Sequence, residues 1–184
     1  MFKKILAQLG TVLPKRKIPY MIIGGQAVLL YGEPRLTIDI DITLGVDIDH
    51  LDDLLGVAEK LYLKPLPQNT PEFVRQTMVL PCLHEETGIR VDFIFSYTPY
   101  ETQAIQRANK IIIENTQVCF ASVEDLVIHK IFAGRPRDLE DVRSILVRNS
   151  DIDKEYITAW LEQFDALSQE NNFLKTFYST LSDI

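Results

Sequence analysis

Two aspartates in the segment 36–44 are the strongest candidates for chemistry in this sequence. Apolar and polar residues alternate strictly across the segment, which predicts a half-buried strand with Asp39 and Asp41 on its polar face. Two carboxylates this close repel each other, and a divalent cation such as Mg²⁺ relieves the repulsion because hard cations prefer oxygen ligands. We therefore predict that Asp39 and Asp41 are metal ligands. The alternative is a solvated strand face, on which two aspartates cost little.

The chain contains a second Asp-Ile-Asp tripeptide that serves as an internal comparison. Asp47 and Asp49 lie in the first turn of the predicted amphipathic helix at 47–61. Helix capping and the helix dipole account for acids at a helix start. The pair at 39 and 41 has no such local explanation, which favours a functional role for it.

A third carboxylate, Asp92, lies in the predicted strand 89–95. Val91, Phe93 and Phe95 lie on one predicted face of this strand, and Arg90, Asp92 and Ile94 lie on the other. An aspartate in such apolar surroundings needs a partner. An ion pair with Arg90 or another base is one possible interpretation. Given the first pair, we favour a third metal ligand supplied by a neighbouring strand.

The double glycine Gly24–Gly25 follows a predicted strand at 20–23 and precedes a predicted helix at 26–31. Backbone N–H groups at such a helix start can hold phosphate oxygens. Taken alone the signal is weak, because Gly–Gly is common in turns. The segment matches neither the dinucleotide-binding nor the P-loop pattern, so both of those readings lose their main support.

Hydrophobic periodicity predicts strands early in the chain and helices at its end, which favours an α/β or α+β sheet domain followed by a helical segment. We expect a sheet domain over 1–150 and a helical appendage over 151–184. Strands are predicted at 20–23, 36–44, 74–83, 89–95, 111–113 and 118–120, and a loop at 64–73. Helices are predicted at 2–13 (ended by Pro14), 26–31, 47–61, 98–108, 122–132 and 137–148, and within 153–182.

Composition indicates a soluble globular protein, with 184 residues, 46% hydrophobic and 24% charged residues. The formal net charge of −7 argues against a default nucleic-acid binder. A cluster of arginines at 135, 137, 143 and 148 nevertheless leaves RNA as one of the candidate acceptors. No segment has the ~18 apolar residues of a membrane span, so we expect a cytoplasmic protein without membrane association. The three histidines are predicted to be surface or structural residues.

The order of these motifs resembles the nucleotidyltransferase superfamily, in which a glycine turn precedes a D-x-D strand and a later strand aspartate. The resemblance covers roughly residues 18–148. Two blocks are similar to its AbiEii-like branch: Gly24-Gly25-Gln26-Ala27, Tyr31-Gly32, Arg35-x-Thr37 and Asp39-Ile40-Asp41; and Ser122-Val123-Glu124-Asp125 with Lys130, Arg135, Arg137, Asp138 and Asp141.

The resemblance implies a mixed β-sheet flanked by helices that bears three carboxylates. It also implies transfer of a nucleoside monophosphate from an NTP to an acceptor hydroxyl, with two Mg²⁺ ions. Asp39, Asp41 and Asp92 would be the catalytic residues and the metal ligands, and Asp92 would also accept the proton. Nucleotide contacts would come from Gly24, Gly25, Arg35, Thr37, Lys130 and Arg137.

Several of these expected contacts have open alternatives. Arg35 and Thr37 could instead only buttress the loop before the strand. Lys130 could equally be a solvated helix lysine. Asp138 and Asp141 are expected to orient Arg137, Lys130 or Arg35.

The acceptor stays open among RNA, protein and a small molecule. Some AbiEii-like members are toxins of toxin–antitoxin pairs, which implies a possible antitoxin partner, and some related toxins modify tRNA ends. Other relatives nucleotidylate antibiotics. A catalytically silent binding or regulatory module with the same fold is the alternative from another functional class.

Overall fold

The computed structural model describes residues 1–96, 98–167 and 172–184, and contacts divide the chain into two compact units. The first unit contains Met1–Gln26 and Leu36–Ala121, and the second contains Ala27–Arg35 and Ser122–Ile184. This division differs from the predicted boundary at residue 150. Helices α6 (Val123–Ala133) and α7 (Pro136–Arg148) lie before that residue but group with the C-terminal helices. Whether residues 1–150 act as one functional domain stays a prediction.

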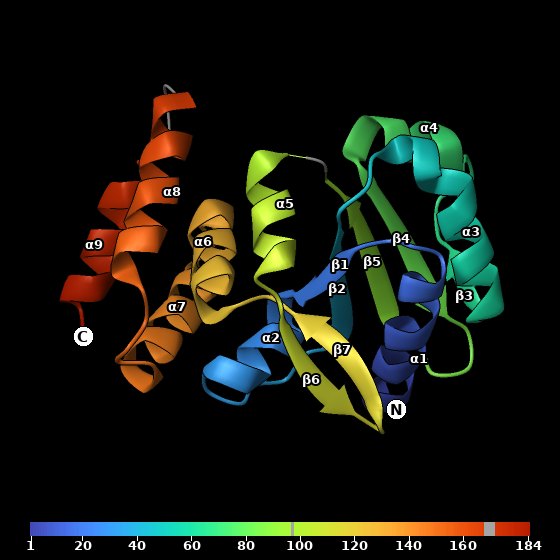
Figure 1. Ribbon diagram of the computed structural model, residues 1–184, viewed down its shortest axis with the longest axis horizontal. Helices are drawn as coiled ribbons and strands as arrows, with labels where there is room; N and C mark the ends of the chain where they lie inside the picture. Colours follow the sequence, from blue (N-terminus) through green and yellow to red (C-terminus); the bar gives the residue numbers. More distant parts are fainter. Residues whose placement is uncertain (97, 168–171) are drawn as a thin grey trace. The chain divides into compact units, whose positions relative to one another are not determined.

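The first unit is built on a seven-stranded mixed sheet with the strand order β3-β4-β5-β2-β1-β7-β6 (Figure 1). The pairs β2–β5 and β1–β7 are parallel, and the other neighbouring pairs are antiparallel. The predicted mixed sheet with flanking helices is thereby confirmed. Its strands are β1 (Tyr20–Ile23), β2 (Asp39–Leu44), β3 (Leu63–Pro65), β4 (Val79–His84), β5 (Arg90–Phe95), β6 (Asn109–Ile113) and β7 (Thr116–Phe120).

The core of this unit covers the apolar face of the central strands. Ile40, Ile42 and Leu44 of β2 are fully buried, as are Val91 and Phe93 of β5. Because side chains alternate along a strand, this burial leaves Asp39, Asp41 and Asp92 on the opposite face.

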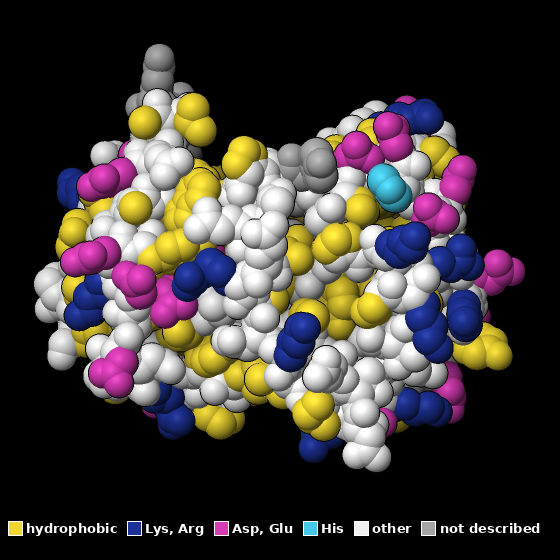
Figure 2. All heavy atoms as spheres, viewed as in Figure 1, with side chains coloured by type: hydrophobic (Ala, Val, Ile, Leu, Met, Phe, Trp, Pro, Cys, Tyr) yellow, Lys and Arg dark blue, Asp and Glu magenta, His cyan; other side chains and the backbone are white. Residues whose placement is uncertain are grey.

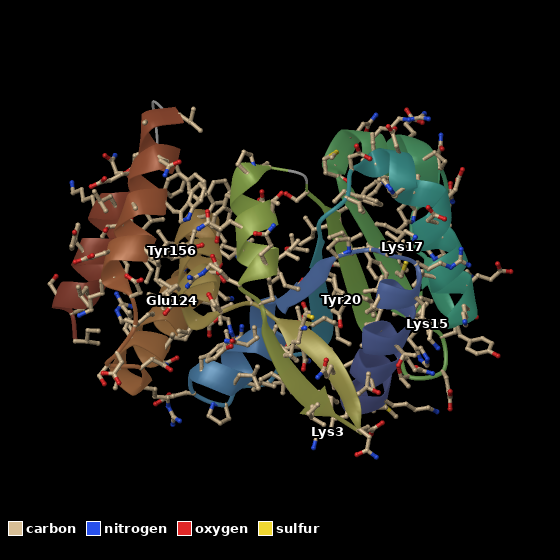
Figure 3. All side chains as sticks on the ribbon, in the orientation of Figure 1. Lys3, Lys15, Lys17, Tyr20, Glu124 and Tyr156 are labelled. Atoms are coloured by element: carbon tan, nitrogen blue, oxygen red, sulfur yellow. The ribbon has the colours of Figure 1, made fainter. Side chains whose placement is uncertain are left out.

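A hydroxyl group also ties two strands of the sheet together. Tyr20, on β1 and labelled in Figure 3, accepts a hydrogen bond through its hydroxyl from the N–H of Cys119 at 3.2 Å. Burial raises the pKa of Tyr20 to about 12, so this hydroxyl stays protonated.

Four helices and a short 3₁₀ turn complete the first unit. Helix α1 packs against β7, α3 against β3 and α4 against β4. Asp47 caps the turn by accepting a hydrogen bond from the N–H of Asp49 at 3.1 Å, which confirms the capping expected of this second aspartate pair. The elements are α1 (Phe2–Lys15), η1 (Ile48–His50), α3 (Leu51–Lys60), α4 (Thr70–Thr77) and α5 (Pro99–Gln106).

The second unit is helical and contains α6 (Val123–Ala133), α7 (Pro136–Arg148), α8 (Lys154–Leu167) and α9 (Phe173–Ser182). Helix α6 packs against α7, α8 and α9, and Figure 1 shows α8 and α9 side by side. The hydroxyl of Tyr156, labelled on α8 in Figure 3, donates to Oδ1 of Asp125 on α6 at 2.9 Å. Ser122 caps α6 by accepting from the N–H of Asp125, as the S-x-x-D pattern predicts.

Helix α2 (Gly24–Tyr31) joins the two units, because Gly24–Gln26 group with the sheet and Ala27–Tyr31 with the helices. The predicted helix at 26–31 therefore begins two residues earlier than expected. Gly24 and Gly25 therefore belong to the first turn of helix α2.

Other predicted bounds were also wrong, and the differences at three places have a clear physical reason. Helix α1 continues through Pro14 to Lys15, because a proline in the last turn removes only one backbone hydrogen bond. Strand β2 begins at Asp39 rather than at 36, and Ile38 is 71% exposed. The predicted loop and strand over 64–83 instead hold β3, helix α4 and β4. Proline at the start of α4 and a left-handed Met78 at its end delimit this helix.

Within the described residues, no helix has the length and apolar character needed to cross a membrane.

Candidate active site

The register between two parallel strands brings the predicted carboxylates together. Asp41 on β2 lies opposite Asp92 on β5, and Asp39 lies opposite Arg90. Residues opposite each other on paired strands project from the same face of the sheet. Asp92 therefore lies next to the Asp39–Asp41 pair, as the sequence predicted. Arg90, on the same strand as Asp92, lies near all three carboxylates.

Arg90 is the site residue whose role the sequence left undecided. Its Nε donates to Oδ1 of Asp92 at 2.7 Å, so the ion pair considered as an alternative is present. The hydrogen bond with Asp92, together with the negative charges of Asp92, Asp39 and Asp41, raises the pKa of Arg90. The Arg90 side chain is 52% exposed, against 16% for Asp92. A half-exposed cation thus compensates part of the charge that a metal ion would otherwise balance.

Two hydrogen bonds fix the start of β2. The hydroxyl of Thr37 donates to Oδ1 of Asp39 at 2.9 Å. The Nε2 of Gln26 donates to the backbone oxygen of Asp39 at 3.1 Å, and the Gln26 side chain is buried. Thr37 therefore contacts a carboxylate directly, whereas Gln26 positions the strand; its place beside the double glycine was the only sequence signal for this role.

The glycine turn lies against the second aspartate of the pair. Gly24 has a φ of +62°, and a Cβ atom at this residue would overlap Oδ2 of Asp41 and lie 2.8 Å from its Cγ. Only glycine permits this close approach of the backbone to the carboxylate. Gly24 and Gly25 form the first turn of α2, where backbone N–H groups lack intrahelical partners. A phosphate held there would face a carboxylate, so a cation is needed between the two.

A separate ion cluster in the second unit contains the other predicted cations. Arg35 binds Asp141 through two hydrogen bonds of 2.7 and 2.8 Å. Nζ of Lys130 lies 2.7 Å from Asp138 and 2.8 Å from Asp141, and Arg135 also binds Asp138. Only 7% of the Lys130 side chain is exposed, so its interpretation as a solvated lysine was wrong. The expectation that the two aspartates orient Lys130 and Arg35 is confirmed.

These five residues, named here the Lys130 cluster, stabilise ionised carboxylates despite their burial. Burial alone raises the pKa of Asp141, but hydrogen bonds from Arg35 and Lys130 outweigh it and leave the pKa below its usual value. The pKa of Asp138 is lowered in the same way by Arg135 and Lys130. Arg137 is exposed at the start of α7. Nucleotide contacts by Arg35, Lys130 and Arg137 stay predictions.

The donor set on the sheet fits a magnesium ion bound together with a substrate. Among the residues that the structure describes, no three His, Cys, Asp or Glu side chains are grouped as a complete metal site. Mg²⁺ commonly takes only one or two protein carboxylates and completes its shell with water and substrate phosphates. Asp39 and Asp41 meet that requirement, whereas Asp92 is held by Arg90.

A mixed sheet that carries a glycine turn and strand carboxylates is the architecture of the nucleotidyltransferases, and solved structures of that class share the fold. The antibiotic-resistance factor ANT(2″)-Ia is 15% identical with a TM-score of 0.60, over 90% of this chain and 94% of that one. A nucleotidyltransferase-like antigen from Paracoccidioides brasiliensis is 19% identical with a TM-score of 0.58, over 98% and 87%. The lincosamide antibiotic adenylyltransferase LnuA is 20% identical with a TM-score of 0.54, over 77% and 94%.

The model of one protein family, described as a nucleotidyltransferase of unknown function (DUF6036), matches residues 1–182. The chain belongs to this family. No curated protein matches the sequence. The superfamily expected from the motifs is thereby confirmed, and the narrower AbiEii-like assignment stays a prediction.

Proposed function

We propose that this protein transfers a nucleoside monophosphate from an NTP to the hydroxyl group of an acceptor and releases pyrophosphate. The observation that carries the proposal is the register of β2 and β5, which sets Asp41 beside Asp92 on the face where Gly24 meets Asp41. A strand aspartate pair, a third aspartate on the adjacent strand and a glycine turn at a helix start are the parts that this chemistry uses.

Each residue has a distinct task in the proposed reaction. Asp39 and Asp41 would hold Mg²⁺, which would supply positive charge to balance the triphosphate. N–H groups of Gly24 and Gly25 bind the departing phosphates. Thr37 keeps Asp39 in position through the 2.9 Å hydrogen bond to its Oδ1.

The transfer itself is an in-line displacement at the α-phosphorus. The acceptor oxygen forms a bond with phosphorus, the bond from phosphorus to the bridging oxygen of the β-phosphate breaks, and pyrophosphate leaves. Asp92 accepts the proton of the attacking hydroxyl. Because Arg90 donates to Oδ1 of Asp92 in the structure, Arg90 must loosen this contact or leave the second carboxylate oxygen to take the proton.

The class of acceptor is the next part of the proposal, and charge distribution bears on it. Phosphate-backbone recognition requires clustered Lys and Arg side chains. On the face shown in Figure 2, basic side chains near α1 and α3 are interspersed with acidic ones, and Arg16 pairs with Asp53 at 3.9 Å. Helix α1 covers the side of the sheet opposite the aspartates, so this face does not decide the acceptor. The formal net charge of −7 supports a small-molecule or protein acceptor over RNA. ANT(2″)-Ia has been solved with adenylyl-2″-tobramycin and LnuA with lincomycin, so these antibiotics are the first small acceptors to test.

The test follows label from each α-³²P-labelled NTP, with Mg²⁺, into three separate pools: total RNA, lysate protein and small molecules. Label in any pool that depends on Asp41 supports the transferase and identifies the acceptor class. Absence of both label transfer and NTP binding would overturn it and favour the silent regulatory module. Label in tRNA would instead support the AbiEii-like assignment, for which an antitoxin partner remains a prediction.

A further inference from the structure

A pocket of about 590 Å³ lies next to the proposed catalytic face, within the same unit of the chain. Its walls come from the segment after β3, from α4 and from the neighbouring strands β4 and β5. Arg90, which binds Asp92, is one of its lining residues. Pockets of this volume are the size that small-molecule ligands occupy.

One row of paired residues connects this pocket with the glycine turn. Across the sheet, Ile23 pairs with Asp41, Asp41 with Asp92, and Asp92 with Pro81. The backbone N–H of Leu66 then donates to the oxygen of Pro81 at 2.9 Å. Pro81 and Leu66 line the pocket, whereas the glycine turn directly follows Ile23.

The two aspartates therefore lie between the two ends of the row. Because neighbouring strands are about 4.8 Å apart, Asp92 is within about 10 Å of either end. In an in-line displacement the entering oxygen and the departing pyrophosphate lie on opposite sides of the phosphorus. If the glycine turn holds the departing phosphates, the acceptor must approach from the pocket.

We propose that this pocket binds the acceptor, and that the acceptor is a compact, neutral, sugar-like polyol; this inference rests on the proposed transferase function. Gln68, Asn69 and Gln76 line the pocket with amide groups, which both donate to and accept from hydroxyls. The exposed ring of Phe73 offers an apolar surface for the C–H face of a sugar ring.

The charges of the pocket fit a neutral ligand. Its two charged lining residues, Glu72 and Arg90, are of opposite sign. Glu72 accepts a hydrogen bond from Asn69 at 2.6 Å, and Arg90 is bound to Asp92. A nucleic acid would need several cations at such a surface, and a polycationic acceptor would need several acids.

The inference is tested with Gln76→Ala and Phe73→Ala, two exposed positions of α4 where a smaller side chain leaves the core intact. Gln103→Ala on α5 is the matched control, because Gln103 is also an exposed helical glutamine but lines a different pocket. The probes are myo-inositol, trehalose and methyl glucoside as neutral polyols, tobramycin as a polycation, and total tRNA. Label transfer from NTP gives the KM of each acceptor, and a titration with labelled NTP gives nucleotide affinity.

We expect a neutral polyol to take label. Gln76→Ala and Phe73→Ala should raise its KM by about fivefold to tenfold, because each removes one hydrogen bond or one ring contact. Nucleotide affinity should stay unchanged in both variants, and Gln103→Ala should match the parent protein. NMR spectra with the NTP and the polyols should show shifted side-chain amide signals for Gln68, Asn69 and Gln76.

Three results would overturn the inference. One is preferential labelling of tobramycin or tRNA. Another is a polyol KM within about twofold of the parent value in both α4 variants, since a lost contact costs more than that. The third is NTP binding without either labelling of any neutral polyol or a shift of the pocket amides. Loss of NTP binding itself, in the parent protein, would instead contradict the proposed function.

Discussion

A Cβ atom on Gly24 would overlap Oδ2 of Asp41, so the backbone of the glycine turn and the carboxylate occupy adjoining space. This contact makes Gly24 a sensitive position. We predict that Gly24→Ala displaces the Asp41 carboxylate and weakens Mg²⁺-dependent NTP binding by more than about tenfold, in addition to the ~1 kcal/mol cost of placing alanine at positive φ.

Gly88→Ala is the matched control for this change. Gly88 has a φ of +69°, close to that of Gly24, but no atom lies within 4 Å of its Cβ position. It should lose a similar amount of stability in urea unfolding while its NTP affinity stays at the parent value. Equal NTP affinities in the two variants would show that the contact with Asp41 is irrelevant to binding.

Arg90 should compete with a metal ion for the carboxylates. Its guanidinium is bound to Asp92, and the charges of Asp39 and Asp41 also raise its pKa. We predict that Arg90→Ala lowers the Mg²⁺ concentration needed for half-maximal NTP binding and enlarges the rise in melting temperature caused by Mg²⁺, because a competing cation has been removed. Thermal unfolding with and without Mg²⁺ measures the rise in melting temperature, and NTP titration at several Mg²⁺ concentrations measures the half-maximal concentration.

Lys64→Ala provides the comparison, since Lys64 forms an exposed ion pair with Glu85 at 3.6 Å on the strand pair β3–β4. It should leave the Mg²⁺ response unchanged. A weaker Mg²⁺ response in Arg90→Ala would mean that Arg90 supports metal binding, contrary to this prediction.

The Lys130 cluster should make stability fall at acid pH. Hydrogen bonds from Lys130 and its neighbours lower the pKa values of Asp138 and Asp141 below the usual 3.8. A lowered pKa in the folded state adds stability above the unfolded pKa, and this contribution is lost as the pH falls from about 4 through the folded values. Urea unfolding between pH 2 and pH 6 should show this loss, and Asp141→Asn should show less of it.

Removing the central cation should cost far more than removing a surface one. Lys130→Ala leaves two buried carboxylates without that partner, and such a change costs about 3–5 kcal/mol. Arg143 forms an exposed pair with Asp183 at 2.9 Å, so Arg143→Ala should cost less than about 1 kcal/mol. Similar unfolding free energies for the two variants would contradict the structural role of the cluster.

His129 adds a second pH dependence at higher pH. Burial lowers its pKa to about 4 from 6.5, so the unfolded chain binds the proton more readily than the folded one. Stability should therefore fall as the pH is lowered from about 6.5 to about 4, by up to about 2–3 kcal/mol. His129→Gln should flatten unfolding free energy over this window; an unchanged slope would assign the pH dependence to other groups.

Sequence patterns predicted the parts of the site that depend on local periodicity. The alternation around Asp41 and Asp92 identified two strands and the face of each, because side-chain direction follows directly from strand geometry. The sequence also distinguished the two Asp-Ile-Asp tripeptides, placing the first on a strand and the second at a helix start. The cap formed by Asp47 confirms the second assignment.

Features that depend on tertiary contacts could not be predicted in the same way. Nothing local distinguishes a solvated lysine from Lys130, whose burial depends on aspartates eight and eleven residues further along the chain. The pairing of Arg90 with Asp92 was one of several options until the sheet order was known. Helix α4 was not predicted, because its buried Val74 was counted as the start of the apolar segment that forms β4.

The two Asp-Ile-Asp tripeptides allow the most direct test of the central claim, that Asp39 and Asp41 are the metal-binding residues of a nucleotidyltransferase. Asp41→Asn is compared with Asp49→Asn, which makes the same chemical change in a tripeptide of the same sequence at the 3₁₀ turn η1 before α3. The measurement is release of pyrophosphate from NTP in the presence of Mg²⁺ and the acceptor pools. Urea unfolding shows that both variants are folded.

We predict that Asp41→Asn lowers the rate by more than about 100-fold, because a metal ligand is lost, while Asp49→Asn stays within about twofold of the parent protein. A folded Asp41→Asn variant that releases pyrophosphate at the rate of Asp49→Asn would contradict the account.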